Sequence, residues 1–388
     1  DESTIAADAA AVSVAASFSP IGAVAVSVGA TVATNTIANA VEAGVRNADT
    51  LVQAREGDLD ISADSKATIT AKTVAAAAAF AIAPASFALA GAVTTSANTI
   101  TSTVTALIED ADNTSATPVV KAEGEVRVQA TDTQTIDATI LAVALSGSFA
   151  FGIATGVSLA DNTLGQTTSA HISGSSVQSD TDADAAAGFG DIEVYASSTP
   201  TIPTTSVAAA VTISRGGASG AGAESNLTIQ PTTEAYVDGS ALTATGHDIL
   251  VDATTTSVAA PTVASAAVGT IAIAVLDSTA LIAGTTRAYI GGNSSISAKK
   301  LDVEAVDANT ATSKSTIVGV GAVAGTGATA SAVISRATLA YIADDAIVVA
   351  TGTPVLLTAK TLDNKATSEV LNVSVGAVQI SVVTNTAN

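Results

Sequence analysis

Residues 57–112 read GDLDISADSKATITAKTVAAAAAFAIAPASFALAGAVTTSANTITSTVTALIEDAD, and this pattern recurs along the whole chain. The segment opens with a short run, Leu59 to Ala63, in which aliphatic and polar residues alternate. A long uncharged run of mainly Ala, Val, Ser and Thr follows, from Thr73 to Ile108, and Pro84 interrupts it near its middle. An acidic turn, Glu109 to Asp112, ends the segment. Because alternation with a period of two is typical of a strand with one buried face, the segment predicts strands.

The opening run returns five more times, at intervals of roughly 52 to 67 residues, in the form aliphatic-x-aliphatic-x-Ala. The copies are Val126–Ala130, Ile192–Ala196, Ile249–Ala253, Leu301–Ala305 and Val355–Ala359. A fixed repeat of this length predicts an array in which each unit buries one face against the next unit. We divide the chain into an incomplete first repeat at 1–56, which lacks the opening strand, five full repeats at 57–352, and an incomplete last repeat at 353–388, with only the opening strand and a hairpin.

The predicted fold is all-β: an elongated repeat array, either a β-solenoid or long β-hairpins stacked into two closely packed sheets. Turn-forming residues near the middle of each repeat mark a reversal between two long strands. Helices compete poorly, because β-branched residues are interleaved throughout and capping signals are sparse. The predicted turns are at Pro20, Pro84, Ser146–Ser148, Arg215–Gly217, Gly269, Gly325–Gly327 and Gly376.

Composition and charge narrow the possible partners. The net charge of −21 makes nucleic acid and anionic membranes poor partners. The uncharged runs Ala9 to Val41 and Thr73 to Ile108 exceed the length of a membrane helix, but Pro20, Pro84 and many polar residues interrupt them, so we expect no membrane-spanning segment. The chain starts at Asp1-Glu2 without a basic leader, which favours a mature or excised segment.

Two rows of similar side chains are expected along the array. The first is a ladder of asparagines, whose stacked amides can hydrogen-bond in line as in cross-β stacks; its members are Asn35, Asn98, Asn162, Asn226 and Asn385. The second is an aromatic stripe made by His171, Tyr236, Tyr289 and Tyr341. A packed or rim-exposed stack is one interpretation of this stripe, and a surface on which carbohydrate stacks is the other.

One acidic cluster resembles a calcium loop. Asp180, Asp182 and Asp184 alternate along the chain, and Asp191 falls at the twelfth position from the first of them. Ala185 stands at the sixth position, where a calcium loop needs Gly, so a solvated acidic loop is the alternative. Calcium is the one cofactor that the sequence suggests.

Catalytic constellations are not recognisable in the sequence. The chain has two histidines, His171 and His247, in different repeats, and no cysteine, so zinc sites and Ser-His-Asp or Cys-His machinery have no support. We expect His171 to pack in the aromatic stripe and His247 to be exposed in a turn. Carboxylate pairs for polysaccharide cleavage cannot be singled out among 35 acidic residues. We therefore expect no enzyme.

The sequence pattern of the repeats resembles that of very large bacterial surface proteins. The segments that carry the resemblance are Asn35–Ile37, Gly57–Ala63 and Gly284–Ile290. They are similar to repeats of filamentous-haemagglutinin-type adhesins and of the fusobacterial leukotoxin. The resemblance covers essentially the whole chain and implies secretion, a β-solenoid-like rod, and a role in adhesion or surface structure. It implies no catalytic residue.

Taken together, these features predict a structural extracellular protein, a subunit or stalk segment of a bacterial cell-surface filament. The expected partners are further copies of the chain, added end to end. In the expected mechanism the first repeat accepts the strand around Val355, Leu357 and Ala359 from the preceding copy, as an exposed sheet edge accepts an added strand. The alternative is an adhesin or toxin passenger rod that binds glycans or host surfaces through the aromatic stripe or loops.

Overall fold

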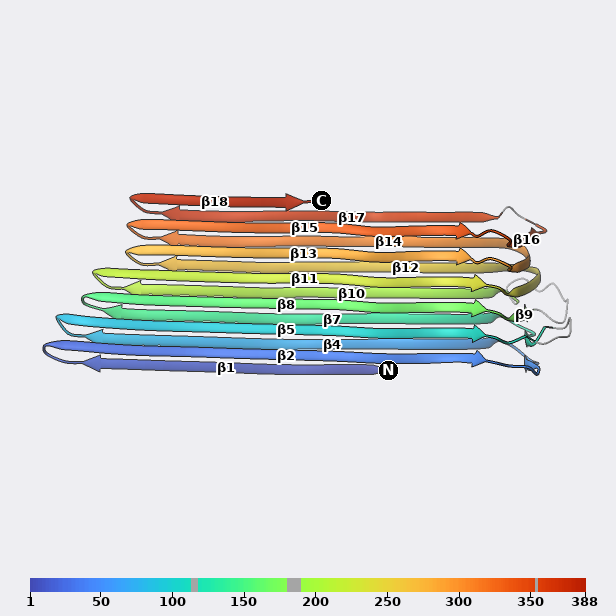
Figure 1. Cartoon of the computed structure of the whole chain (residues 1–388), viewed down its shortest axis with the longest axis horizontal. Helices are drawn as coiled ribbons and strands as arrows, with labels where there is room; N and C mark the ends of the chain where they lie inside the picture. Colours follow the sequence, from blue (N-terminus) through green and yellow to red (C-terminus); the bar gives the residue numbers. More distant parts are fainter. Residues whose placement is uncertain (113–117, 180–189, 353–354) are drawn as a thin grey trace.

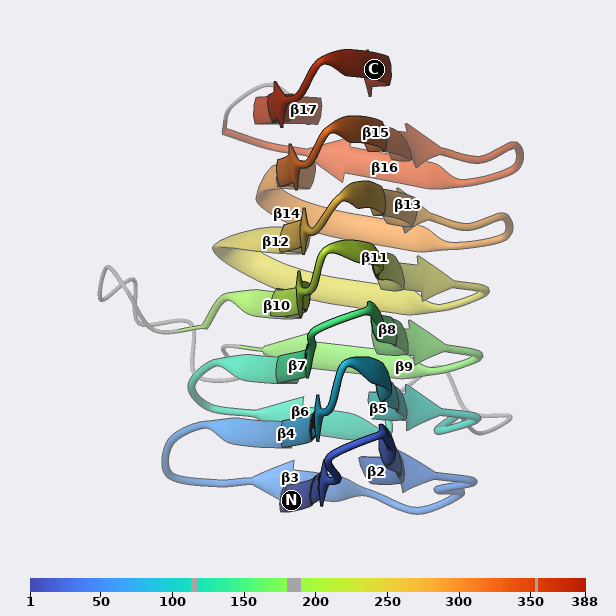
Figure 2. The same cartoon turned by 90° about the vertical axis from the view of Figure 1, so that its left-hand side faces the viewer.

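The computed structural model describes residues 1–112, 118–179, 190–352 and 355–388 and has the form of a stack of coils, whose long strands run along the longest axis of the molecule (Figures 1 and 2). Each coil consists of a long strand, a tight turn and a second long strand, and every coil but the last adds a short third strand. The two long strands of a coil lie in different sheets and do not pair with each other. The all-β repeat array is thus confirmed, and of the two predicted forms the β-solenoid is the correct one. The described residues contain no helix.

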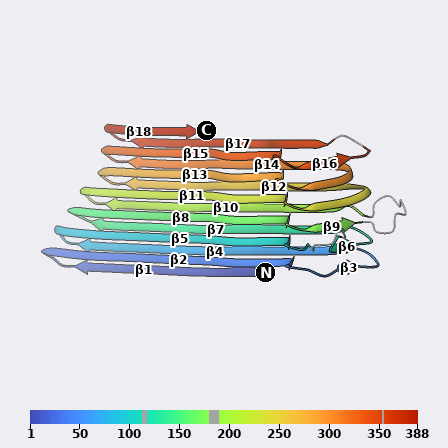
Figure 3. The same ribbon diagram turned by 45° about the vertical axis from the view of Figure 1, so that its right-hand side comes forward.

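Two parallel sheets face each other across the interior. Sheet A stacks the long strands β1 (Glu2–Phe18), β4 (Leu59–Ile82), β7 (Val126–Ser148), β10 (Ile192–Ile213), β12 (Ala241–Val268), β14 (Ser295–Val320) and β17 (Leu356–Val375). Sheet B stacks β2 (Gly22–Arg46), β5 (Ala85–Glu109), β8 (Phe151–Ser173), β11 (Gly216–Asp238), β13 (Ile271–Ile290), β15 (Val323–Ile342) and β18 (Val378–Ala387). The short strands β3 (Val52–Ala54), β6 (Val120–Ala122), β9 (Ser176–Ser179) and β16 (Ile347–Ala350) form a further parallel ladder with the first residues of β12 and β14 (Figure 3).

Successive coils stack in register, so that each residue lies beside the residue at the same place in the next coil. Ile61, for example, pairs with Val128, and Val128 with Val194. We call such a series of residues along the stack a row. Because side chains alternate between the two faces of a strand, every second row points into the interior and the rows between them point outward.

The interior consists of layers that follow one another along the strands. Next to the tight turns the buried residues are almost all alanine, as in Ala77, Ala90 and Ala144. Farther along, isoleucine and leucine fill the middle, and valine, isoleucine and leucine fill the layer beside the short strands. Buried polar rows of Ser, Thr and Asn separate these layers. The small, uncharged composition of the chain therefore reflects two sheets that pack against each other with alanine between them.

The turns account for the remaining special residues. Sheet A strands connect to sheet B strands at one end of every coil, which we call the tip (Figure 1). At the far end of sheet B, corners recur in a left-handed conformation, at Asn47, Asp110, Gly174, Gly239, Asn293 and Asp345. These are the residue types that tolerate this conformation best. The turn expected at Gly325–Gly327 is corrected: these residues lie inside β15, and the tip of that coil is at 321–322.

Candidate functional site

The two end coils present unpaired sheet edges. At the amino-terminal end, β1 pairs only with β4 and β2 only with β5. At the carboxy-terminal end, β17 pairs only with β14, and β18 only with β15. Such edges carry free backbone donors and acceptors and are templates for further strands.

Alternate residues of each edge strand direct their backbone N–H and C=O groups to the open edge, and the sets of residues that do so at the two ends are complementary. At the amino-terminal end, Lys66 N donates to Asp1 O over 2.9 Å, so the inward-facing residues of β1 bond to β4 and its outward-facing residues direct their backbone groups to the open edge. At the carboxy-terminal end, Gly321 N donates to Val375 O over 2.9 Å, so the outward-facing residues of β17 bond to β14 and its inward-facing residues are open. Sheet B repeats this arrangement, with Asn47 N donating to Glu109 O at one end and Asn388 N to Ala332 O at the other. One end can therefore pair with the other as interior coils pair.

The side-chain rows also match between the ends. Val12 and Val373 belong to one outward row of sheet A, and their side chains are 74% and 39% exposed. Val26 and Val378 belong to one outward row of sheet B and are likewise exposed. Placing one end on the other therefore sets aliphatic side chains beside aliphatic side chains.

Of the residues expected to insert into the first repeat of another copy, Leu357 and Ala359 lie in β17 of their own chain, and Val355 directly precedes β17. β17 pairs with β14 as far as Val375, with one register shift between Ala308 and Thr310 of β14. Its later part occupies the same rows as β1, since Leu371 and Ala10 share a row. One layer cannot hold both strands, so this geometry favours stacking of whole coils over insertion of β17 beside β1.

The asparagine ladder exists over three coils. Asn35 Nδ2 donates to Asn98 Oδ1 and Asn98 Nδ2 donates to Asn162 Oδ1, each over 2.7 Å. Asn226 does not join them, because Leu227 occupies the next place in this row; Asn226 points outward and donates to Glu224. Asn385 lies in a different row, opposite Ala330. Alignment of the repeats by sequence alone had assigned both residues to the wrong row.

The aromatic stripe is a continuous face-to-face stack on the outer side of sheet B. Ring centroids of His171 and Tyr236 are 4.6 Å apart, those of Tyr236 and Tyr289 4.9 Å, and those of Tyr289 and Tyr341 5.0 Å. Burial, the largest cause, raises the pKa of Tyr236 and Tyr289 and lowers the pKa of His171, which favours neutral rings. The Arg287 guanidinium lies 5.5 Å from the Tyr289 centroid. Because the rings cover one another's faces, the ring surfaces outside the stack are the ring edges, the free face of Tyr341 and the face of His171 toward Leu107.

Of the four residues of the suggested calcium loop, Asp191 lies among the described residues. Asp180, Asp182 and Asp184 lie outside the described residues. Asp191 Oδ1 accepts a hydrogen bond from Asp248 N over 2.9 Å, as Asp58 Oδ1 does from Glu125 N over 2.8 Å. Asp191 thus links successive coils. No group of three or more His, Cys, Asp or Glu side chains suited to a metal was found among the described residues.

His247 is buried, at 7% exposure, rather than exposed as the sequence suggested. Its Nδ1 lies 3.9 Å from Asp191 Oδ1. The ring is therefore part of the contact between the coils that meet at Asp191.

Sequence reasoning missed two buried carboxylates, Asp132 and Asp307, which lie in one inward row of sheet A. Asp307 forms an ion pair with Arg336, whose Nε lies 3.1 Å from Asp307 Oδ2. Two threonine hydroxyls, of Thr286 and Thr338, also donate to Asp307. Ser102 and Gln134 donate to Asp132 Oδ2, while its Oδ1 has no partner. Burial raises the pKa of Asp132 to about 6.

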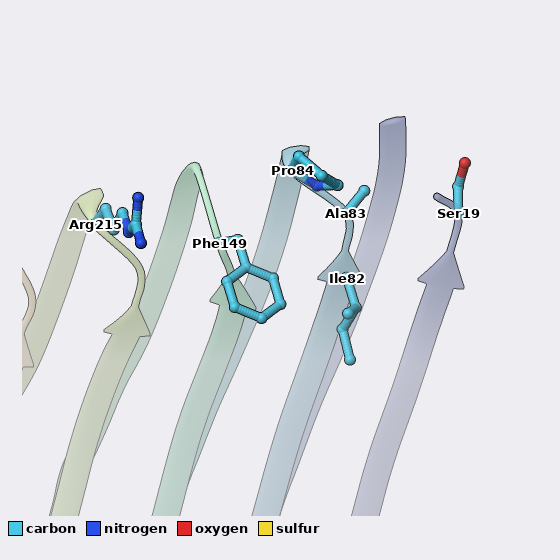
Figure 4. Close-up of a pocket in the computed structure, with 6 residues that line it drawn as sticks. All are labelled: Ser19, Ile82, Ala83, Pro84, Phe149 and Arg215. Atoms are coloured by element: carbon cyan, nitrogen blue, oxygen red, sulfur yellow. The ribbon is translucent and has the colours of Figure 1, made fainter. Parts of the chain in front are cut away.

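A groove of about 390 Å³ crosses the tips of four neighbouring coils (Figure 4). It is lined by Ser19, Ile82, Ala83, Pro84, Phe149 and Arg215. This lining includes one charged side chain and no acid–base pair, so it supplies no catalytic constellation.

No family model, no curated protein and no solved structure matches the chain. Within the described residues, no helix is long and apolar enough to cross a membrane.

Proposed function

We propose that this chain is a structural protein, a subunit or stalk segment of an extracellular bacterial surface filament that grows by stacking end coil on end coil. The observation that carries the proposal is the complementarity of the two open ends in hydrogen-bonding phase and in side-chain rows. The bacterial surface setting rests on the resemblance of the repeats to large surface proteins. Rod-like β-solenoids suit a mechanical role, because their stability is a sum of contacts between neighbouring coils.

The stacked junction would repeat an interior coil boundary. The open N–H and C=O groups of β17 and β18 on one copy would pair with those of β1 and β2 on the next. Aliphatic rows would continue across the junction, and each square ångström of apolar surface that they remove from water contributes about 25 cal/mol. The junction is thus extensive and directional, and it leaves each added copy with the same free end.

One row at this junction brings like charges together. Asp8 and Glu369 belong to the same outward row of sheet A, and each has a lysine as its neighbour inside its own copy, Lys72 and Lys314 respectively. Adjacent like charges on neighbouring strands are destabilising by a few tenths of a kcal/mol to about 1 kcal/mol. End-to-end growth should therefore be favoured by salt, which screens exposed charges.

Glycan binding through the aromatic stripe gains no support from the geometry. A sugar ring stacks on an aromatic face, and neighbouring rings cover both faces of Tyr236 and Tyr289 and one face of His171, which is buried. The stack instead adds contacts between coils, as a structural role requires.

The proposal is tested by blocking one edge. Ala6 and Ala10 point outward on β1, so their N–H groups face the open edge. Proline at an edge position removes a donor without breaking an internal ladder bond. We expect the wild-type chain to form filaments whose length rises with protein concentration, and the Ala6→Pro/Ala10→Pro variant to remain as single rods.

The matched control is Ala6→Val/Ala10→Val, which keeps the edge donors and should assemble like wild type. Negative-stain microscopy and sedimentation velocity give the readout, and circular dichroism checks that each variant is folded. Wild-type protein that stays as single rods at high concentration, or a proline variant that assembles as well as the valine control, would overturn the proposal.

A further inference from the structure

The outer face of sheet B near the tips carries large aliphatic side chains, although its interior side carries alanine. On β13, Ile273 and Val275 point outward and are each 54% exposed, whereas Ala272 and Ala274 between them are buried. On β18, Ile380 and Val382 point outward and are 64% and 63% exposed. Contiguous aliphatic side chains of this kind on a surface mark an interaction site rather than ordinary scatter.

The strands next to these two carry glycines at the corresponding outward positions, Gly220 and Gly222 on β11 and Gly325 and Gly327 on β15. None of the four has a positive φ. A Cβ added at Gly220, Gly222 or Gly327 would meet nothing within 4 Å, and at Gly325 the nearest atom would be 3.9 Å away. Neither backbone conformation nor packing within the chain requires these glycines.

Glycine inside a strand is destabilising, and it often marks a place where another surface approaches closely. The register aligns the four glycines with the four aliphatic residues in two rows. The first is Gly220, Ile273, Gly325, Ile380 and the second is Gly222, Val275, Gly327, Val382. Grooves over β11 and β15 therefore alternate with ridges on β13 and β18. We call these eight residues the ridged face.

We infer that the ridged face binds the ridged face of a second copy of this chain, with a twofold axis that runs parallel to the strands between β13 and β15. Under this axis the β13 ridge of each copy enters the β15 groove of the other. The β18 ridge of each copy enters the β11 groove of the other in the same way. Within these two rows, all four strands then find a partner of opposite relief, as a self-complementary twofold interface requires.

The direction of the axis follows from the charges. A twofold axis parallel to the strands keeps each position along the strands, so the apolar tip halves of the two copies meet. In the next outward row, Glu224 of one copy then faces Thr384 of the other, and Asp277 faces Thr329. No like charges oppose one another. Reversing the strands would instead lay the apolar tip half of one copy on the polar half of the other.

The contact has the size of a stable interface. It spans four strands and is limited by the ten residues of β18. With strands about 4.8 Å apart and a rise of about 3.3 Å per residue, the footprint is roughly 600 Å² per copy. The total of about 1,200 Å² lies at the lower end of the range for specific protein–protein interfaces.

This side-by-side pairing uses the surface of sheet B, whereas end-to-end growth uses the sheet edges, so either can fail without the other. The pairing is therefore measured in the Ala6→Pro/Ala10→Pro background, in which end-to-end growth is suppressed. Sedimentation equilibrium is expected to show a dimer, and microscopy of wild-type filaments is expected to show rods in laterally joined pairs.

Filling the grooves tests the inference. Gly220→Val/Gly325→Val is expected to weaken dimerisation at least about 100-fold. Each added side chain fills a groove that a ridge should enter, and the twofold axis makes this clash occur twice in the dimer. The monomer should stay folded, because valine favours strands and meets open space. The control is Gly91→Val, an outward glycine of the same row on β5, outside the ridged face; it should dimerise normally.

A ridge–groove exchange tests the position of the axis. Gly325→Ile alone should abolish the dimer, and adding Ile273→Gly should restore it, because the two positions face each other across the axis. A monomeric parent at high concentration, an unaffected Gly220→Val/Gly325→Val dimer, or an exchange that restores nothing would each overturn the inference.

Discussion

Replacing Asp132 by asparagine should stabilise the protein at neutral pH. The carboxylate is fully buried between the sheets and has no cation beside it. Its Oδ2 accepts hydrogen bonds from Ser102 and Gln134, but its Oδ1 has no partner, and neither has Gln134 Oε1. An amide at position 132 has the same shape, removes the buried charge, and brings an N–H group that can donate to Gln134 Oε1. The substitution therefore removes a cost and keeps the packing.

The size of the effect follows from the pKa. Burial raises the pKa of Asp132 from 3.8 to about 6, a difference of about 2 units, or about 3 kcal/mol at 1.36 kcal/mol per unit. Since the pKa is higher in the folded state, the folded protein binds this proton more tightly than the unfolded chain. The stability contributed by the protonated group is present below about pH 4 and is lost as the pH rises through 6. Asparagine does not titrate.

Urea unfolding followed by circular dichroism checks this prediction. Wild type and Asp132→Asn should be equally stable near pH 4, and the variant should be more stable by up to about 3 kcal/mol at pH 7. Equal stability at both pH values, or a variant that is less stable at pH 7, would refute the assignment of Asp132 as a buried carboxylate without a cation.

The matched control is Asp307→Asn, in the same row. Asp307 forms an ion pair with Arg336, and both side chains are only 1% exposed. Removing the carboxylate leaves the guanidinium charge buried, so this variant should be less stable than wild type by about 3–5 kcal/mol at pH 7. The same change of residue in one row is thus expected to have opposite effects, decided by the presence of a cation.

The remaining predictions concern the aromatic stripe and the stacked junction. Tyr289→Ala removes two ring contacts and should lower stability by about 1–3 kcal/mol in thermal unfolding, whereas Tyr195→Ala on sheet A, outside the stripe, should cost less; equal losses would count against a role for the stack. Asp8→Asn removes a like-charge contact with Glu369 at the junction and should lower the protein concentration needed for filament growth about 2- to 5-fold at low salt, measured by light scattering. That gain should shrink at high salt, and Asp137→Asn, an exposed residue of β7 that β4 separates from the edge, should show none; a gain that is independent of salt would contradict the proposed contact.

The architecture could be predicted from the sequence because it depends on periodicity. Alternation with a period of two and a recurring opening strand are local patterns, and they indicate a stacked β array without knowledge of the turns. Register was harder to predict, because the coils differ in length. Asn226 was misplaced by one residue, and in a strand a slip of one residue moves a side chain from the interior to the surface.

The two buried carboxylates could have been found. Asp132 and Asp307 each follow the alanine of an opening strand by two residues, which puts them on its buried side. The turn between β14 and β15 was misplaced because four glycines lie between positions 319 and 327, and each is compatible with a turn. Composition alone does not distinguish among them. The ridges and grooves of the ridged face could not be predicted from the sequence either. They depend on the register that brings residues some fifty positions apart next to one another.

Mass per length, measured by scanning transmission electron microscopy on filaments of the purified chain, tests the end-to-end account most directly. Seven stacked coils at about 4.8 Å give each 37.4 kDa chain a length of roughly 34 Å along the axis. The account predicts about 1.1 kDa per Å for a single filament, and twice that value for laterally paired ones. Particles that never lengthen, or a mass per length that fits neither value, would contradict it.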